Sequence, residues 1–195
     1  MRRALLVFLS LLLALTGSAV SAQDGFYVIP SLKTVPKTGQ TTSYGTRDDG
    51  ALEKGVAWPT PRFTDNNDGT VTDNLTRLIW MKNANAFSTR TWAEALDLAN
   101  NLASGSYGLS DGSQAGDWRL PNIKELQSLI DFSKSYPPLP ENHPFTNWLG
   151  AYYWSSTTRA HGSPEAWIVY FTEGNLGWYA KSLGNCYVWC VRGGQ

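Results

Sequence analysis

The stretch Asp117-Trp118-Arg119-Leu120-Pro121 joins a short apolar segment to the start of a helix. Asn122, which follows it, is a good N-cap residue, and Glu125 stands three positions later, the spacing of a capping box. Apolar side chains at helical spacing then predict a helix from Ile123 to Phe132. An extended segment that leads directly into a capped helix predicts a junction inside the fold, and it is the best guide to which fold the chain has.

The charged residues of this stretch fit an architectural role better than a catalytic one. In an extended segment Asp117 and Arg119 lie on one side, and Trp118 points to the other side, toward the core or a helix. A guanidinium such as that of Arg119 suits a bidentate pair with a carboxylate or bonds to loop carbonyls. We therefore interpret Asp117, Trp118, Arg119 and Pro121, together with Trp154, as a structural signature.

Patterns on both sides of this junction predict an α+β fold. A further helix is expected from Trp92 to Ala103, because Thr91 and Glu94 form another capping box. Asp68-Gly69 predicts a hairpin turn, and strands are expected at Leu75–Met81, Tyr152–Ser156, Trp167–Thr172, Leu176–Ala180 and Tyr187–Arg192. Strands at both ends and helices between them predict a loop-rich domain, in which two helices flank antiparallel sheet and the N- and C-terminal strands pair.

The N-terminal part of the chain has the pattern of an export signal. Residues 1–22 combine a charged start, the apolar run Ala4–Leu15 and the small residues Val20-Ser21-Ala22 before a cleavage site. The apolar run is shorter than the roughly 20 residues of a membrane span. Residues 23–60, with little periodicity, are expected to form an extended arm, and residues 61–195 the domain. We expect an exported protein, periplasmic or extracellular, without a membrane span once the signal is removed.

The mature chain is weakly acidic and rich in aromatic residues. Loss of Arg2 and Arg3 leaves 14 basic residues against 16 acidic ones, a net charge of −2. This charge disfavours nucleic acid and anionic membranes as partners. The nine Trp, nine Tyr and seven Phe residues of the full chain either build the core or line a face for sugar or peptide.

Residues for catalysis or metal binding are sparse. The two histidines, His143 and His161, lie in loop-like segments outside any nucleophile motif. Asp65–Gly69 fits a hairpin turn better than a calcium loop, because the twelfth position is Thr76 rather than a bidentate Glu. We expect no metal, no cofactor and no enzymatic activity.

The only cysteines are Cys186 and Cys190. If the residues between them form a strand, their Cα atoms lie about 13 Å apart, whereas a disulfide allows less than about 7 Å. A tight turn or bulge would bring them together, and an oxidising compartment favours pairing where geometry permits. The sequence therefore leaves open whether Cys186 and Cys190 form a disulfide or remain free thiols.

Several ordered blocks resemble one known family. They are Pro36–Gln40 with Asp48-Asp49-Gly50 and Arg62-Phe63, Asp68–Thr76 with Trp80, Asp117–Asn122 with Glu125-Leu126, Tyr153–Thr157, and Cys190–Gly194. With them the chain resembles the Lcl C-terminal-like domain family, named from a bacterial collagen-like adhesin. The resemblance implies a C-type-lectin-like fold and recognition outside the cell. The chain lacks the Gly-X-Y stalk of that adhesin, and its charge gives no sign of a surface for sulfated glycans.

We therefore expect a non-enzymatic recognition or adhesion module that binds a glycan or a protein at the cell envelope. The ligand face is expected between Ser133 and Gly177, with the candidates Trp148, Tyr152, Trp167 and Trp178 and the polar partners Asn147, Glu173 and Asn175. One alternative is a structural envelope component without a small ligand, for which oligomerisation is possible. Another is an oxidase similar to the formylglycine-generating enzymes, which use a cysteine pair near the C-terminus.

Overall fold

The computed structural model describes residues 35–194, so the expected signal peptide and the first residues of the expected arm, 23–34, lie outside it.

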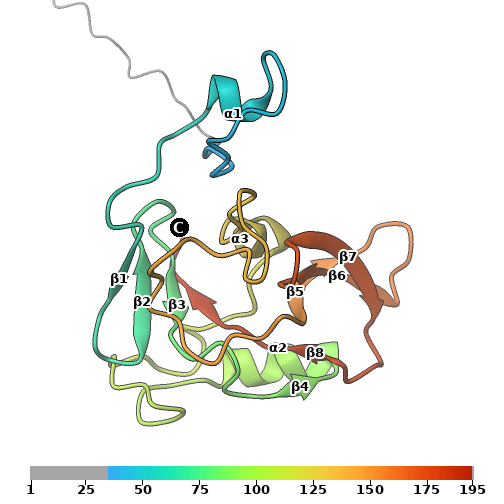
Figure 1. The fold of residues 1–195 in the computed structure, drawn as a ribbon. Coiled ribbons are helices and arrows are strands. Elements are labelled where there is room, and N and C mark those ends of the chain that lie inside the picture. Colours follow the sequence, from blue (N-terminus) through green and yellow to red (C-terminus); the bar gives the residue numbers. More distant parts are fainter. Residues whose placement is uncertain (1–34, 195) are drawn as a thin grey trace, which may run out of the picture. The chain divides into compact units, whose positions relative to one another are not determined.

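The strands of the domain form two sheets. One sheet has the order β1-β2-β3-β9, with β1 Phe63–Asp65, β2 Thr70–Asp73, β3 Ile79–Met81 and β9 Val191–Arg192. The other has the order β4-β8-β5-β6-β7, with β4 Thr89–Arg90, β8 Cys186–Tyr187, β5 Tyr152–Thr158, β6 Glu165–Tyr170 and β7 Asn175–Ala180. The helices are α1 Asp49–Leu52, α2 Trp92–Asn100 and α3 Ile123–Gln127 (Figure 1). Few helices and two mainly antiparallel sheets confirm the α+β class.

The hairpin predicted at Asp68-Gly69 connects β1 to β2. Asn67 and Gly69 both have positive φ, at 59° and 86°. A Cβ atom on Gly69 would lie 2.3 Å from the carbonyl oxygen of Gly108, so a loop passes too close for any side chain there. The glycine therefore fixes both the turn and the position of the loop beside it.

The segment expected to be one strand, Tyr187–Arg192, is divided between the two sheets. β8 pairs with β4 and β5, whereas β9 pairs with β3, opposite Ile79 and Trp80. In Figure 1 the red β9 lies beside the green β3. Strands from the two ends of the domain thus share a sheet, as expected, but the prediction of a continuous final strand is wrong. Burial explains the break, because Val188, Trp189 and Cys190 pass through the core between the sheets.

The two predicted capping boxes are present, and both helices are shorter than predicted. Thr91 caps α2 with Glu94, and Asn122 caps α3 with Glu125. α3 ends at Gln127 rather than Phe132. The backbone N–H groups of Asp131 and Phe132 donate instead to the carbonyl oxygens of Pro138 and Thr38, each at 2.9 Å. Tertiary bonds therefore end a helix that the apolar periodicity alone would continue.

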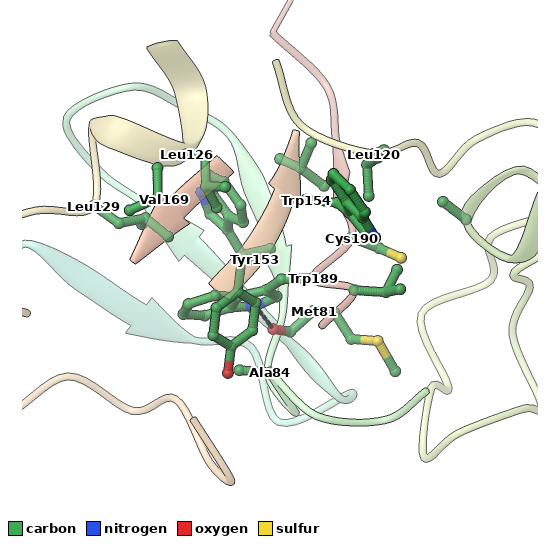
Figure 2. Close-up of a cluster of buried hydrophobic side chains, with 14 of the residues drawn as sticks. Met81, Ala84, Leu120, Leu126, Leu129, Tyr153, Trp154, Val169, Trp189 and Cys190 are labelled. Carbon is green, nitrogen blue, oxygen red and sulfur yellow. Dashed lines mark hydrogen bonds between the residues drawn. The ribbon is translucent and has the colours of Figure 1, made fainter. Parts of the chain in front are cut away.

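Aromatic side chains from both sheets fill the core. Trp80, Trp118, Trp154, Trp189, Tyr153 and Phe171 are all fully buried. The Trp189 ring lies 4.8–5.7 Å from the rings of its aromatic neighbours Trp80, Phe145, Tyr153 and Phe171. Its indole N–H donates to the Met81 carbonyl at 2.8 Å, the dashed line in Figure 2. The buried and hydrogen-bonded Trp189 indole thus ties the segment between β8 and β9 to the end of β3.

The described part of the expected arm is not simply extended. It contains α1, whose N-cap Asp48 accepts hydrogen bonds from Tyr44, Gly45 and Ala51. Farther on, the Trp58 indole donates to the Lys37 carbonyl at 2.9 Å, which closes the segment on itself. Within residues 35–194 no helix has the length and apolar character to cross a membrane.

Candidate ligand-binding face

One face of the five-stranded sheet carries three tyrosines from three neighbouring strands. Tyr152 on β5 stands opposite Tyr170 on β6, with ring centroids 4.7 Å apart. The Tyr179 ring of β7 lies 5.9 Å from that of Tyr152 and is stacked against it. We call Tyr152, Tyr170 and Tyr179 the tyrosine face. Tyr152 is 39% exposed, and the other two are half-buried, so all three rings present area to solvent.

A buried layer supports these rings. Trp154 is the next residue on the same side of β5 and is fully buried, with its ring 6.2 Å from that of Tyr179. Its indole N–H donates to the Arg90 carbonyl at 2.8 Å, which fixes its orientation. Ala166 and Ile168 of β6 lie on the same side and are buried as well. The tyrosine rings therefore lie beside a group of buried side chains on the same side of the sheet.

Gly177 leaves a hollow in the tyrosine face. The hollow has a volume of about 300 Å³ and is lined by Tyr152, Ile168, Gly177 and Tyr179, and also by Trp178, whose position in the strand alternation belongs to the opposite face; none of these residues is acidic or basic. A Cβ atom on Gly177 would meet only the Ile168 side chain, at 3.5 Å, an ordinary van der Waals contact. The backbone at this position has no positive φ that would require glycine. Gly177 therefore keeps the hollow open and is not required by the backbone conformation of the strand.

Polar groups stand at the rim of the tyrosine face. Asn175 lies opposite Tyr170 in the sheet, so it shares the face, and its amide donates to Glu173 at 2.9 Å. The Asn185 amide donates to the Tyr179 hydroxyl at 3.4 Å. The face thus combines exposed rings with carboxamide and hydroxyl groups that both donate and accept hydrogen bonds.

Two predicted ligand residues, Trp167 and Trp178, lie on the opposite face of the same sheet. They stand opposite one another on β6 and β7, with rings edge to face at 6.2 Å. The Arg159 guanidinium covers the Trp178 ring at 4.0 Å and also pairs with Glu165. The structure therefore brings Tyr152 together with Asn175 and Glu173 but separates them from this tryptophan pair.

The remaining two predicted ligand residues lie in the loop before β5. Trp148 is half-buried and packs against the core. Asn147 has a φ of 55° and donates to the Asn83 side chain at 3.2 Å. Both side chains hold this loop in place. Tyr170 and Tyr179 were not among the residues predicted from the sequence. The alternation of side chains along residues 165–170 and 175–180 can be read from the sequence. The sequence does not show, however, which residues of two neighbouring strands stand opposite one another.

The polar side chains of the Asp117–Pro121 stretch form hydrogen bonds to other parts of the fold. Arg119 forms a bidentate pair with Glu125, at 2.7 and 2.6 Å, and donates to the Gly193 carbonyl at 3.1 Å. The hydrogen bond to Glu125 is the main cause that raises the pKa of Arg119. Trp118 is buried and donates to the Ser113 hydroxyl at 2.9 Å, while Asp117 accepts from the Gln114 backbone. Asp117, Trp118 and Arg119 thus each form hydrogen bonds within the fold.

Residues 69–192 match the Lcl C-terminal domain in a comparison with protein families. The chain belongs to the Lcl C-terminal domain family. The matched part runs from the β1–β2 turn to the end of β9, so it contains both sheets except for β1, together with the whole tyrosine face. Among curated proteins, none matches the chain.

Both cysteines of this Lcl C-terminal domain are free thiols, buried in the core. Burial raises the pKa of Cys186 to about 12, and it raises the pKa of Cys190 as well. A thiol with a raised pKa stays protonated near neutral pH and is a poor nucleophile. Within residues 35–194 there is also no cluster of three or more His, Cys, Asp or Glu side chains that could hold a metal ion.

Proposed function

We propose that this chain is an exported recognition module of adhesion type that binds an uncharged glycan through its tyrosine face. The observation that carries the proposal is the row of three tyrosine rings, two of which, Tyr152 and Tyr179, line the hollow over Gly177. Membership of the Lcl C-terminal domain family supports an adhesion-type module. The pairing of strands from both ends of the domain supports the finer assignment to a C-type-lectin-like fold.

The chemistry of the face suits a sugar. Tyrosine offers a large rigid ring at low cost in conformational entropy, so it can cover the apolar C–H side of a pyranose. The amides of Asn175 and Asn185 lie where sugar hydroxyls would need donors and acceptors. At about 300 Å³ the hollow is at the small end of ligand pockets, which suits one or two sugar rings. Because no charged side chain lines it, an uncharged sugar is favoured over a sulfated one.

The test is a screen of neutral and sulfated oligosaccharides on a glycan array, followed by calorimetric titration of the best ligand. We expect Tyr152→Ala to weaken binding roughly tenfold or more, as loss of a central aromatic contact does. Gly177→Leu should abolish binding by filling the hollow, although the strand tolerates a side chain at this position.

Tyr44→Ala is the matched control, since Tyr44 is 83% exposed and lies in the segment before the domain. It should bind like the unmodified protein. An array without any bound glycan, or equal affinity in Tyr152→Ala and Gly177→Leu, would refute the proposal and favour the structural alternative.

A further inference from the structure

β7 is an edge strand that lacks the usual protection of such strands. The other edge strands, β1, β4 and β9, have two or three residues, and each contains a charged one: Asp65, Arg90 and Arg192. β7 has six residues, Asn175–Ala180, without charge or proline, in unbroken register with β6. Edge strands normally carry charges, prolines or bulges because an open edge pairs with other strands. An edge of this length without them is suited to pairing.

The free edge of β7 presents a repeating set of backbone groups. Lys181 donates its N–H to Pro164 on the β6 side at 2.8 Å. Because an antiparallel ladder alternates, Asn175, Gly177 and Tyr179 also bond toward β6, and Leu176 and Trp178 point their N–H and C=O groups outward. Outside the ladder, no backbone hydrogen bond within residues 35–194 reaches Leu176 or Trp178.

These groups are self-complementary. We propose that a second copy of this chain pairs antiparallel along β7, about a two-fold axis at Gly177. Leu176 then stands opposite Trp178 of the partner subunit, and each of these pairs exchanges two backbone hydrogen bonds, which makes four in all. Gly177 meets the partner's Gly177 on the axis, where the absence of side chains lets the backbones approach.

The side chains agree with this pairing. Leu176 is 40% exposed and Trp178 is 49% exposed, and both lie on the same side of β7. In the dimer each Leu176 packs against the partner's Trp178, so both lose apolar contact with water. A single six-residue strand buries little area, so the dimer belongs among weak interfaces, with a dissociation constant on the order of 10 to 100 μM.

Such a dimer forms one continuous ten-stranded sheet. Because the axis is perpendicular to that sheet, the two tyrosine faces lie side by side on the same surface. If the proposed glycan binding holds, the pair engages a glycan-coated surface through two sites and gains avidity without a new contact. The dimer itself does not depend on that function.

The test is sedimentation equilibrium of the full mature chain from about 1 μM to 1 mM, a range that brackets the expected dissociation constant. We expect a concentration-dependent dimer. Leu176→Lys should leave it monomeric throughout, because it removes the apolar contact with the partner's Trp178 and places two lysines diagonally across the two-fold axis. Leu176→Pro should do the same by removing an outward N–H while leaving the bonds to β6 intact.

Leu183→Lys is the control, because Leu183 is 46% exposed and lies outside β7; it should dimerise normally. Circular dichroism and thermal melting establish that each variant is folded. A protein that stays monomeric at 1 mM, or a dimer that persists in both Leu176 variants, overturns the proposal. Glycan affinity in solution should be unchanged in Leu176→Pro, so failure of the dimer and failure of the glycan site are distinguishable.

Discussion

At the scale of single residues, the most constrained polar contact is the pair of Arg62 and Asp73. Asp73 is fully buried and accepts from Arg62 at 2.9 and 3.0 Å, and also from the backbone of Leu75 and the hydroxyl of Thr76. The Arg62 guanidinium lies 4.7 Å from the ring centroid of Trp58. A charge in such a place is stable only while its partner is present.

We predict that Asp73→Ala lowers the free energy of unfolding by about 3–5 kcal/mol, because it leaves the buried Arg62 charge unpaired. Chemical denaturation monitored by tryptophan fluorescence measures the change. The control is Asp65→Ala, whose partner Lys82 and whose own side chain are each about 30% exposed; it should cost no more than about 1 kcal/mol. Equal losses in the two variants would contradict this ranking.

The cysteines permit a second prediction at this scale. With both thiols free, buried and of raised pKa, a thiol-reactive dye at pH 8 should label neither Cys186 nor Cys190 on the timescale of minutes. After unfolding in denaturant, both should react. Mass spectrometry of the labelled protein counts the reacted thiols. A disulfide in the purified protein, or rapid labelling of the native state, would show that the thiols are not held as described.

At the scale of elements, the features that could be predicted from the sequence are those that depend on residues close along the chain. The starts of α2 and α3 were correct because Thr91 and Asn122 cap them within four residues. The end of α3 was not, because Pro138 and Thr38 determine it from elsewhere in the chain. The division of Tyr187–Arg192 between two sheets was equally inaccessible, since a β-prone run does not show which partner each residue has.

Glu125 serves both the cap and an ion pair, and substitution separates the two roles. Glu125→Gln keeps a side-chain acceptor for the Asn122 N–H, which capping boxes allow, but it removes the charge that pairs with Arg119. Because Arg119 is partly exposed, we expect a loss of at most about 1 kcal/mol. Glu125→Ala removes both roles and should cost about 1 kcal/mol more. Thermal unfolding of the two variants compares them, and equal stability would mean that the cap contributes nothing.

At the scale of the whole molecule, the family and the class of fold could be predicted from the sequence, whereas the face of the sheet on which each candidate residue lies could not. Tyr152, Asn175, Trp167 and Trp178 were grouped because they are close along the chain and of suitable types. Strand alternation places the two tryptophans on the other side of the sheet, and register brings in Tyr170 and Tyr179 instead. Alternation can be inferred from sequence, whereas register depends on turns and packing that the sequence does not display.

The passage of residues 186–192 from one sheet to the other has a consequence for the order in which the molecule can form. These residues supply β8 and β9 and carry Trp189 into the core, yet a ribosome makes them after every other strand of the domain. Until they emerge, β3 and β5 each lack a neighbour, and the Met81 carbonyl lacks its indole donor. A chain that still lacks residues 186–192 therefore cannot complete either sheet or close this core.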